Sequence, residues 1–120
     1  MPGSRPITVV EMDEFLAATR KLMEDAERAE LVGYLAFAPT AGVVIPGTGG
    51  VRKLGWGLEG RGKRGGAPVI YYYHDDEMPL YLMTAYAKNE HENLNQAEIK
   101  ALQRIAKALV EVNRRQRKSK

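Results

Sequence analysis

Three short runs rich in β-branched and aromatic residues, at 51–56, 67–73 and 80–86, constrain the fold of this 120-residue chain more than any other feature. Runs of this length and composition are typical of β-strands. A loop dense in glycine and cations joins the first two runs, and a charged turn between His74 and Pro79 joins the second to the third. These connections predict hairpins, and therefore three antiparallel strands.

Helical periodicity appears before these strands. Segments 12–26 and 26–37 repeat apolar residues at spacings of three and four, and Pro39 ends the second segment. A brief run at 6–10 reads as an edge strand, because Pro6 stands at its start. The segment from 40 to 50 is rich in turn residues and leads into the first central strand.

The last helix is the clearest element in the sequence. Asn95 is a good N-cap, and Glu98 follows three residues later, as in a capping box. The apolar positions of this helix form one stripe, made of Ile99, Leu102, Ile105, Ala106, Leu109 and Val110. Beyond them, nothing is expected to hold the basic residues 113–120 to a core, so we expect a disordered tail there.

The element order predicts an α+β fold, in which an N-terminal strand and two helices pack on a small twisted antiparallel sheet and a C-terminal helix follows. The length suits a single domain, which we place at residues 1–112. The absence of cysteine excludes disulfides and thiolate nucleophiles. No apolar run approaches a membrane span, so we expect a cytoplasmic protein with no membrane partner.

Positive charge gathers in two segments. Residues 52–64 hold five cations and one acid, a local charge of +4, and residues 113–120 hold five cations and no acid, although the whole chain carries only +3. Clustered lysine and arginine favour a polyanion partner, because they displace counterions from phosphates.

Two phosphate-binding patterns occur in the basic loop but lack their structural context. Gly60–Gly65 satisfies G-x-G-x-x-G, yet a strand follows it where the dinucleotide fingerprint requires a helix. Gly57–Lys63 satisfies most of a P-loop, but Arg64 stands where serine or threonine must hold magnesium. The loop by itself is compatible with an anion-binding surface or with a solvated connection.

The remaining polar clusters also have ordinary interpretations. His74 precedes three acidic residues, but neighbouring side chains in a turn point apart, so we expect no metal site. Alternation along a strand buries either Tyr71 and Tyr73 or Tyr72 alone, and an exposed ring beside a basic loop could stack on a nucleobase.

Five blocks between residues 46 and 94 carry a family resemblance: Val51-Arg-Lys-Leu, Gly60-Arg-Gly-Lys-Arg-Gly-Gly, Val69-Ile-Tyr-Tyr, Tyr81-Leu and Tyr86-Ala-Lys-Asn-Glu. The chain resembles the RelE-type toxins of the RelE/ParE superfamily, found in bacterial type II toxin–antitoxin systems, and in particular the HigB-like branch. The resemblance implies the RelE-like fold. It also implies a ribosome-dependent endoribonuclease that cuts messenger RNA and is restrained by a cognate antitoxin, here expected to be a helix-turn-helix protein of the HigA type.

The chemistry that the resemblance implies requires neither a metal nor another cofactor. The ribose 2′-hydroxyl attacks the adjacent phosphate, a general base accepts its proton, and cations stabilise the phosphorane. Matching the family position by position suggests catalytic roles for Lys53, Arg64 and Lys88. The same comparison suggests RNA-binding roles for Arg52, Arg61, Lys63 and Tyr72.

Two positions depart from the family pattern, because Gly55 and Pro68 stand where strand-borne arginines are usual. Both changes remove a cation from the expected active surface and weaken a strand. They point to a weakened copy of the toxin. Two other functions remain open on the sequence: a ParE-like toxin that binds DNA gyrase, and a nucleic-acid-binding module without activity.

Overall fold

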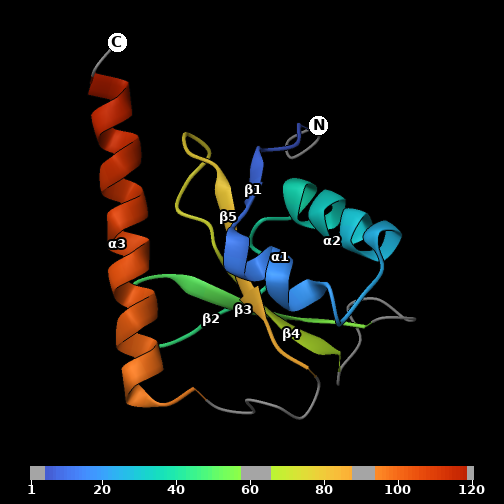
Figure 1. Ribbon diagram of the computed structural model, residues 1–120. Helices are drawn as coiled ribbons and strands as arrows, with labels where there is room; N and C mark the ends of the chain where they lie inside the picture. The colour runs from blue at the N-terminus through green and yellow to red at the C-terminus, as the bar shows by residue number, and fades with distance from the viewer. Residues whose placement is uncertain (1–4, 58–65, 88–93, 119–120) are drawn as a thin grey trace.

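The computed structural model describes residues 5–57, 66–87 and 94–118 of the chain. Its elements are β1 (Val9–Glu11), α1 (Asp13–Thr19), α2 (Asp25–Phe37), β2 (Val43–Val44), β3 (Val51–Trp56), β4 (Ala67–Tyr72), β5 (Leu80–Ala85) and α3 (Gln96–Lys118). The strands form one sheet in the order β1-β5-β4-β3-β2. Helices α1 and α2 lie on one side of this sheet and α3 lies on the other (Figure 1).

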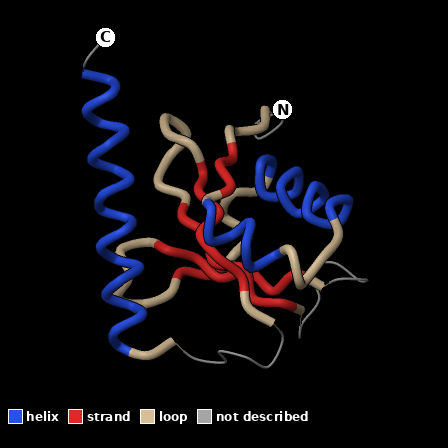
Figure 2. The backbone as a smooth tube through the Cα atoms, viewed as in Figure 1, coloured by secondary structure: helices blue, strands red, loops and turns tan. Residues whose placement is uncertain are grey.

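Each face of the sheet has its own hydrophobic core, because side chains alternate between the faces along a strand. On the α1 and α2 face, a first cluster contains Phe15, Leu31, Leu35, Leu54, Trp56 and Tyr71. On the α3 face, a second cluster contains Val51, Ile70, Tyr72, Met83, Leu102 and Ala106. The strands therefore form the middle of three layers (Figure 2).

The sheet is mixed, whereas the sequence led us to expect antiparallel strands alone. Strands β3, β4 and β5 pair antiparallel as predicted, with Val51 opposite Tyr72. Strand β1, however, pairs parallel with β5, with Val9 opposite Leu80. It begins later than the expected run at 6–10, because the residues that match β5 in register are 9–11.

Helix α1 is much shorter than the segment 12–26 suggested. It ends at Thr19, whose hydroxyl donates to the carbonyl of Phe15 at 2.9 Å. The backbone N–H groups of Leu22 and Met23 then both donate to the Thr19 carbonyl, which forms a turn before α2 begins. This local bonding competes with a continuous helix although the apolar spacing continues.

The turn-rich segment after α2 contains a two-residue strand that the sequence did not reveal. In β2, Val43 pairs with Lys53 and Val44 with Arg52. The turn from β2 to β3 uses glycines with positive φ at 47, 49 and 50, a backbone conformation that other residues rarely adopt. These glycines reverse the chain so that β2 forms an edge of the sheet.

The predicted capping box begins α3. The Asn95 side chain accepts from the N–H of Glu98 at 2.8 Å, and the Glu98 carboxylate accepts from the N–H of Asn95 at 2.9 Å. Although α3 is the longest helix in the part of the chain that the structure describes, none of the helices there is apolar enough over sufficient length to cross a membrane.

The expected disordered tail is wrong for residues 113–118, which continue α3 as helix. Asn113 ties this end to β5 by donating to the Tyr81 hydroxyl at 3.0 Å, and Arg117 forms an ion pair with Glu77 in the β4–β5 turn. Arg114 and Arg115 both pair with Glu111 within the helix. Cations in a last turn also suit the negative end of the helix dipole.

Tyr71 joins the sheet to the segment that follows α2. Its buried hydroxyl donates to the Pro39 carbonyl at 2.8 Å and accepts from the N–H of Gly42 at 2.8 Å. A Cβ at position 42 would lie 2.8 Å from the Tyr71 ring, so glycine is needed for this close approach. The contact holds residues 39–42 against β4.

The substitution Tyr71→Phe is expected to lower the free energy of unfolding by about 1–3 kcal/mol, because it leaves the buried N–H of Gly42 and the partly buried carbonyl of Pro39 without their partner. Urea unfolding at neutral pH would measure the loss. Tyr73→Phe is the matched control, since its hydroxyl bonds to Asp76 in an exposed position. Equal losses in the two variants would contradict a special role for Tyr71.

Stability is expected to fall as the pH rises above 10. Burial raises the pKa of Tyr71, Tyr72 and Tyr86 above the ordinary value of 10.0, so the unfolded chain releases these protons first. The stabilisation is therefore complete below pH 10 and is lost as the pH passes through the raised values. Thermal unfolding followed across this range should show the decline, and it should be shallower in Tyr71→Phe.

Candidate functional site

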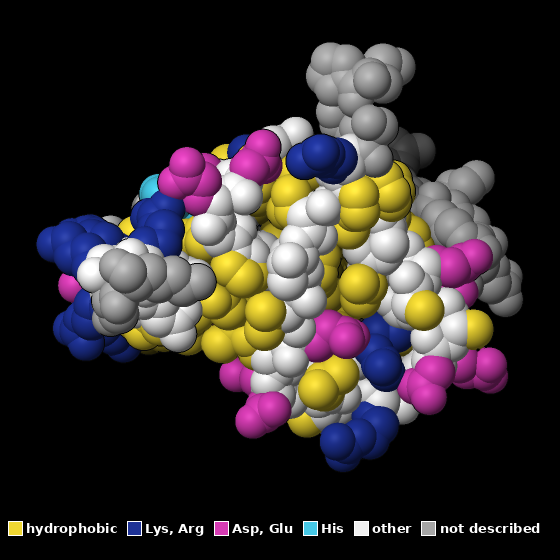
Figure 3. All heavy atoms as spheres, turned by 90° about the horizontal axis from the view of Figure 1, so that it is seen from above, with side chains coloured by type: hydrophobic (Ala, Val, Ile, Leu, Met, Phe, Trp, Pro, Cys, Tyr) yellow, Lys and Arg dark blue, Asp and Glu magenta, His cyan; other side chains and the backbone are white. Residues whose placement is uncertain are grey.

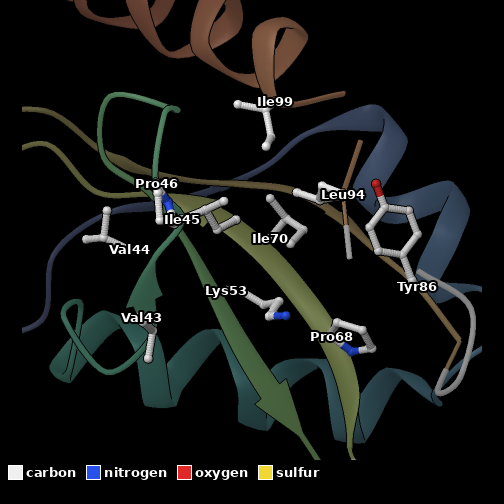
Figure 4. A pocket seen from close by; sticks show the side chains of 10 residues that line it. All are labelled: Val43, Val44, Ile45, Pro46, Lys53, Pro68, Ile70, Tyr86, Leu94 and Ile99. Carbon is white, nitrogen blue, oxygen red and sulfur yellow. The ribbon is translucent and has the colours of Figure 1, made fainter. Parts of the chain in front are cut away.

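A groove with a volume of about 380 Å³ opens on the α3 face of the sheet, where the start of α3 lies above β3 and β4 (Figure 4). Most of its wall is apolar, formed by Ile45, Pro46, Pro68, Ile70, Leu94 and Ile99. Concave surfaces of this kind, with few polar groups, are typical of ligand sites.

Lys53 supplies the charge in this groove. It is exposed on β3, and its strand partner Ile70 lies on the same face of the sheet. Among the described residues that line the groove, Lys53 is the one with an ionised side chain. The structure thus places this sequence-predicted residue on a rigid strand and facing the groove, where its ammonium can attract an anion.

The two departures from the family pattern form a single feature. Gly55 on β3 and Pro68 on β4 are directly opposite each other, two residues along from the Lys53–Ile70 pair and therefore on the same face. Pro68 lines the groove, and its carbonyl accepts from the N–H of Tyr86 at 3.0 Å. This cross-strand pair offers no cation beside Lys53.

Arg52 does not join this site. Alternation turns it to the opposite face, where its Nη1 atom donates to the carbonyl of Gly42 at 2.7 Å and to that of Thr40 at 3.3 Å. The expected RNA-binding role of Arg52 does not fit this geometry. Its guanidinium instead fixes the segment that Tyr71 also holds.

Tyr72 does not present a ring for stacking. Its side chain is only 4% exposed and packs in the cluster beneath α3, and burial raises the pKa of its phenol. Tyr71 is buried on the other face, so both tyrosines are core residues. From the sequence we expected one of these tyrosines to be exposed, because we assumed that one face of β4 is open to solvent. Helices cover both faces, so both side chains are buried.

Tyr86 belongs to the groove, although the sequence argument gave it no role of its own. Its ring lines the wall beside Pro68, while its hydroxyl points away from Lys53 (Figure 4). Burial, and then the charges of Glu98 and Glu14, raise the pKa of its phenol, which therefore stays protonated at neutral pH. The position of Tyr86 just after the last strand is the sequence feature that could have indicated its place in the groove.

Four of the predicted cations, Arg61, Lys63, Arg64 and Lys88, lie outside the described residues. Within the described ranges, no three histidine, cysteine or acidic side chains come together as metal ligands would. His74 and Asp75 approach each other at 3.7 Å as an exposed pair in the turn.

The fold and the groove define a small α+β protein with a cationic strand residue on an open sheet face. Residues 47–119 match the sequence model of the family described as RelE toxin of the RelE/RelB toxin–antitoxin system. The match covers more than half of the chain, which therefore belongs to the RelE toxin family. Toxins of this family are in general ribosome-dependent endoribonucleases, and membership implies an antitoxin partner.

The neighbouring cations Arg52 and Lys53 are expected to respond differently to substitution. Arg52→Met should lower the free energy of unfolding by about 1–3 kcal/mol, because it removes charge-assisted bonds to two carbonyls. Lys53→Met should change it by less than about 0.5 kcal/mol, as for other exposed positions. Thermal unfolding of the pair would test the assignment, and the reverse order would show that Arg52 is not structural.

Proposed function

We propose that this chain is a HigB-like toxin that cleaves messenger RNA on the ribosome and is held inactive by a cognate antitoxin of the helix-turn-helix, HigA-like type. The family match supports toxin function, and the position of Lys53 on a rigid strand supports phosphate chemistry. Rigid placement matters because a charge already fixed in position needs no reorganisation when the transition state forms.

The proposed reaction is transfer of the phosphoryl group within the RNA. The 2′-oxygen forms a bond to the adjacent phosphorus while the bond from phosphorus to the 5′-oxygen breaks. The 2′-hydroxyl gives its proton to a base, and the departing 5′-oxygen gains a proton. The products are a 2′,3′-cyclic phosphate and a 5′-hydroxyl, and no metal is required.

Lys53 is assigned to the negative charge of the phosphorane. Its side chain is exposed on a rigid strand, where an ammonium can meet that charge directly. Arg64 and Lys88 are proposed to share the catalytic work, and Arg61 and Lys63 to hold flanking phosphates. These four assignments rest on the family pattern alone.

The apolar Gly55–Pro68 pair supports weak activity. It lies on the same face as Lys53, yet it supplies no donor to a phosphate. Restoring both arginines would set two like charges directly opposite each other, at a cost in stability of about 0.2–1 kcal/mol. A single arginine at position 68, opposite Gly55, therefore adds a charge to this face without placing two like charges opposite each other.

Pro68→Arg is expected to increase cleavage of messenger RNA on purified translating ribosomes, as mapped by primer extension. Lys53→Ala in that background should reduce the rate by about ten- to ten-thousand-fold, the range for a lost electrostatic partner. Matched controls are Thr8→Arg, which adds an arginine, and Lys21→Ala, which removes a lysine, both at exposed positions away from the groove.

A 2′-deoxy nucleotide at the cleaved position should abolish the reaction, because it removes the attacking hydroxyl. Cleavage that persists on this substrate, or products with a 5′-phosphate, would contradict the mechanism. A folded Pro68→Arg variant that leaves messenger RNA intact but inhibits DNA supercoiling would instead favour the gyrase-binding alternative.

A further inference from the structure

Helix α3 carries a second apolar stripe that the fold does not use. Leu102, Ala106 and their neighbours pack on the sheet. The second stripe lies about 100° around the helix from these core residues. Its members follow one another at steps of four, three and four, a heptad-like spacing, and are Ala101, Ile105, Ala108 and Val112. Ile105 is 37% exposed and Val112 is 47% exposed. A stripe with this spacing is typical of a helix that pairs with another helix.

A groove runs beside this stripe. It has a volume of about 420 Å³ and lies between α3, the beginning of α1 and strand β5, with Met12, Met83 and Ile105 among its apolar residues. Figure 3, which looks down on the C-terminal end of α3, shows hydrophobic side chains exposed beside that helix. A second helix laid along the stripe would cover them.

The charges around the stripe differ between its two ends. Asp13, Glu14 and Glu98 line the groove near the start of α3. The last turns of α3 carry Arg114, Arg115, Arg117 and Lys118. Of these, Arg115 lies on the flank beside the stripe, whereas Arg114 lines the other flank together with Gln103 and Arg117 pairs with Glu77. Arg115 is therefore the cation that a second copy in reverse orientation would bring to the acidic end of the groove.

We propose that two copies of this chain associate through α3, with the helices antiparallel about a two-fold axis. When Ile105 of one copy lies against Ala108 of the other, Ala101 lies against Val112, so a large side chain meets a small one at each level. The same alignment places Glu98 opposite Arg115. Because the axis makes the contact isologous, each complementary pair occurs twice.

This interface lies on a different flank of α3 from Ile99, which lines the Lys53 groove, and Tyr86 is the residue that lines both grooves. The proposal does not depend on the proposed function, since it concerns a different flank of the helix. Three helical turns bury less area than a standard stable interface, so we expect a weak dimer with a Kd of about 10 µM to 1 mM.

The occupant of this groove is identified by self-complementarity. The pairing of large with small residues and of Glu98 with Arg115 arises when this one sequence meets itself in reverse orientation. A second copy is therefore the occupant that the described residues favour. Self-association, and its orientation, are the properties to test.

Sedimentation equilibrium from about 1 µM to about 500 µM should show a reversible monomer–dimer equilibrium. Ile105→Glu should raise its Kd at least about tenfold, because it buries a charge in the apolar stripe. Gln103→Glu, which adds the same charge on the opposite flank of α3, should leave the Kd within about twofold. Circular dichroism would confirm that both variants fold. A monomer at every concentration, or equal effects of the two changes, would overturn the proposal.

Single cysteines test the orientation, since the chain has no native cysteine. On mixing Ala101→Cys with Val112→Cys under mild oxidation, the main product should be the mixed disulfide dimer. In the antiparallel alignment two copies of position 101 lie about 16 Å apart along the helices, far beyond disulfide reach. A dominant disulfide between two copies of position 101 would show that the antiparallel arrangement is wrong.

Discussion

The rest of the structure depends on one buried hydroxyl, that of Tyr71. It is hydrogen-bonded at once to the carbonyl of Pro39 and the N–H of Gly42, so it anchors the exit of α2 to the middle of the sheet. Arg52, on the neighbouring strand β3, also donates a hydrogen bond to the carbonyl of Gly42 in this segment. Strand β2 follows immediately, and its valines form one wall of the Lys53 groove. A polar bond inside the first core thus determines the shape of a surface on the opposite face.

The chemistry of the groove follows from which side chains the sheet supplies. Lys53 stands among apolar neighbours, and the Gly55–Pro68 pair adds shape without charge. Because Lys53 is exposed, water screens its interaction with an anion, and its advantage is its fixed position on the strand. The apolar neighbours leave the second negative charge of the proposed phosphorane without a partner among the described residues. The strands of the proposed site therefore carry fewer charges than the family pattern does.

Local sequence signals predicted the elements whose partners are close in the chain. Strand β3, the starts of β4 and β5, and the capping box of α3 were all predictable, because hairpin turns and caps depend on neighbouring residues. The parallel pairing of β1 was not, since its partner β5 is distant in the chain. The early end of α1 and the two-residue β2 depend on local hydrogen bonds and a glycine turn that the spacing of apolar residues does not reveal. The site shows the same division. Alternation placed Lys53 on a strand, but it did not say which face α3 covers, so Arg52 and Tyr72 were assigned to a surface that they do not reach.

The parallel pairing of β1 with β5 also bears on how the protein forms during synthesis. Residues 9–11 find their partners only at 80–82, and helix α1 packs against that same strand. Strand β1 and helix α1 therefore lack their main partner until β5 has been made and has left the ribosome. Such long-range pairings form late and slow the folding of a domain. The nascent chain of this protein therefore lacks the strand partner of β1 and α1 through most of its own translation.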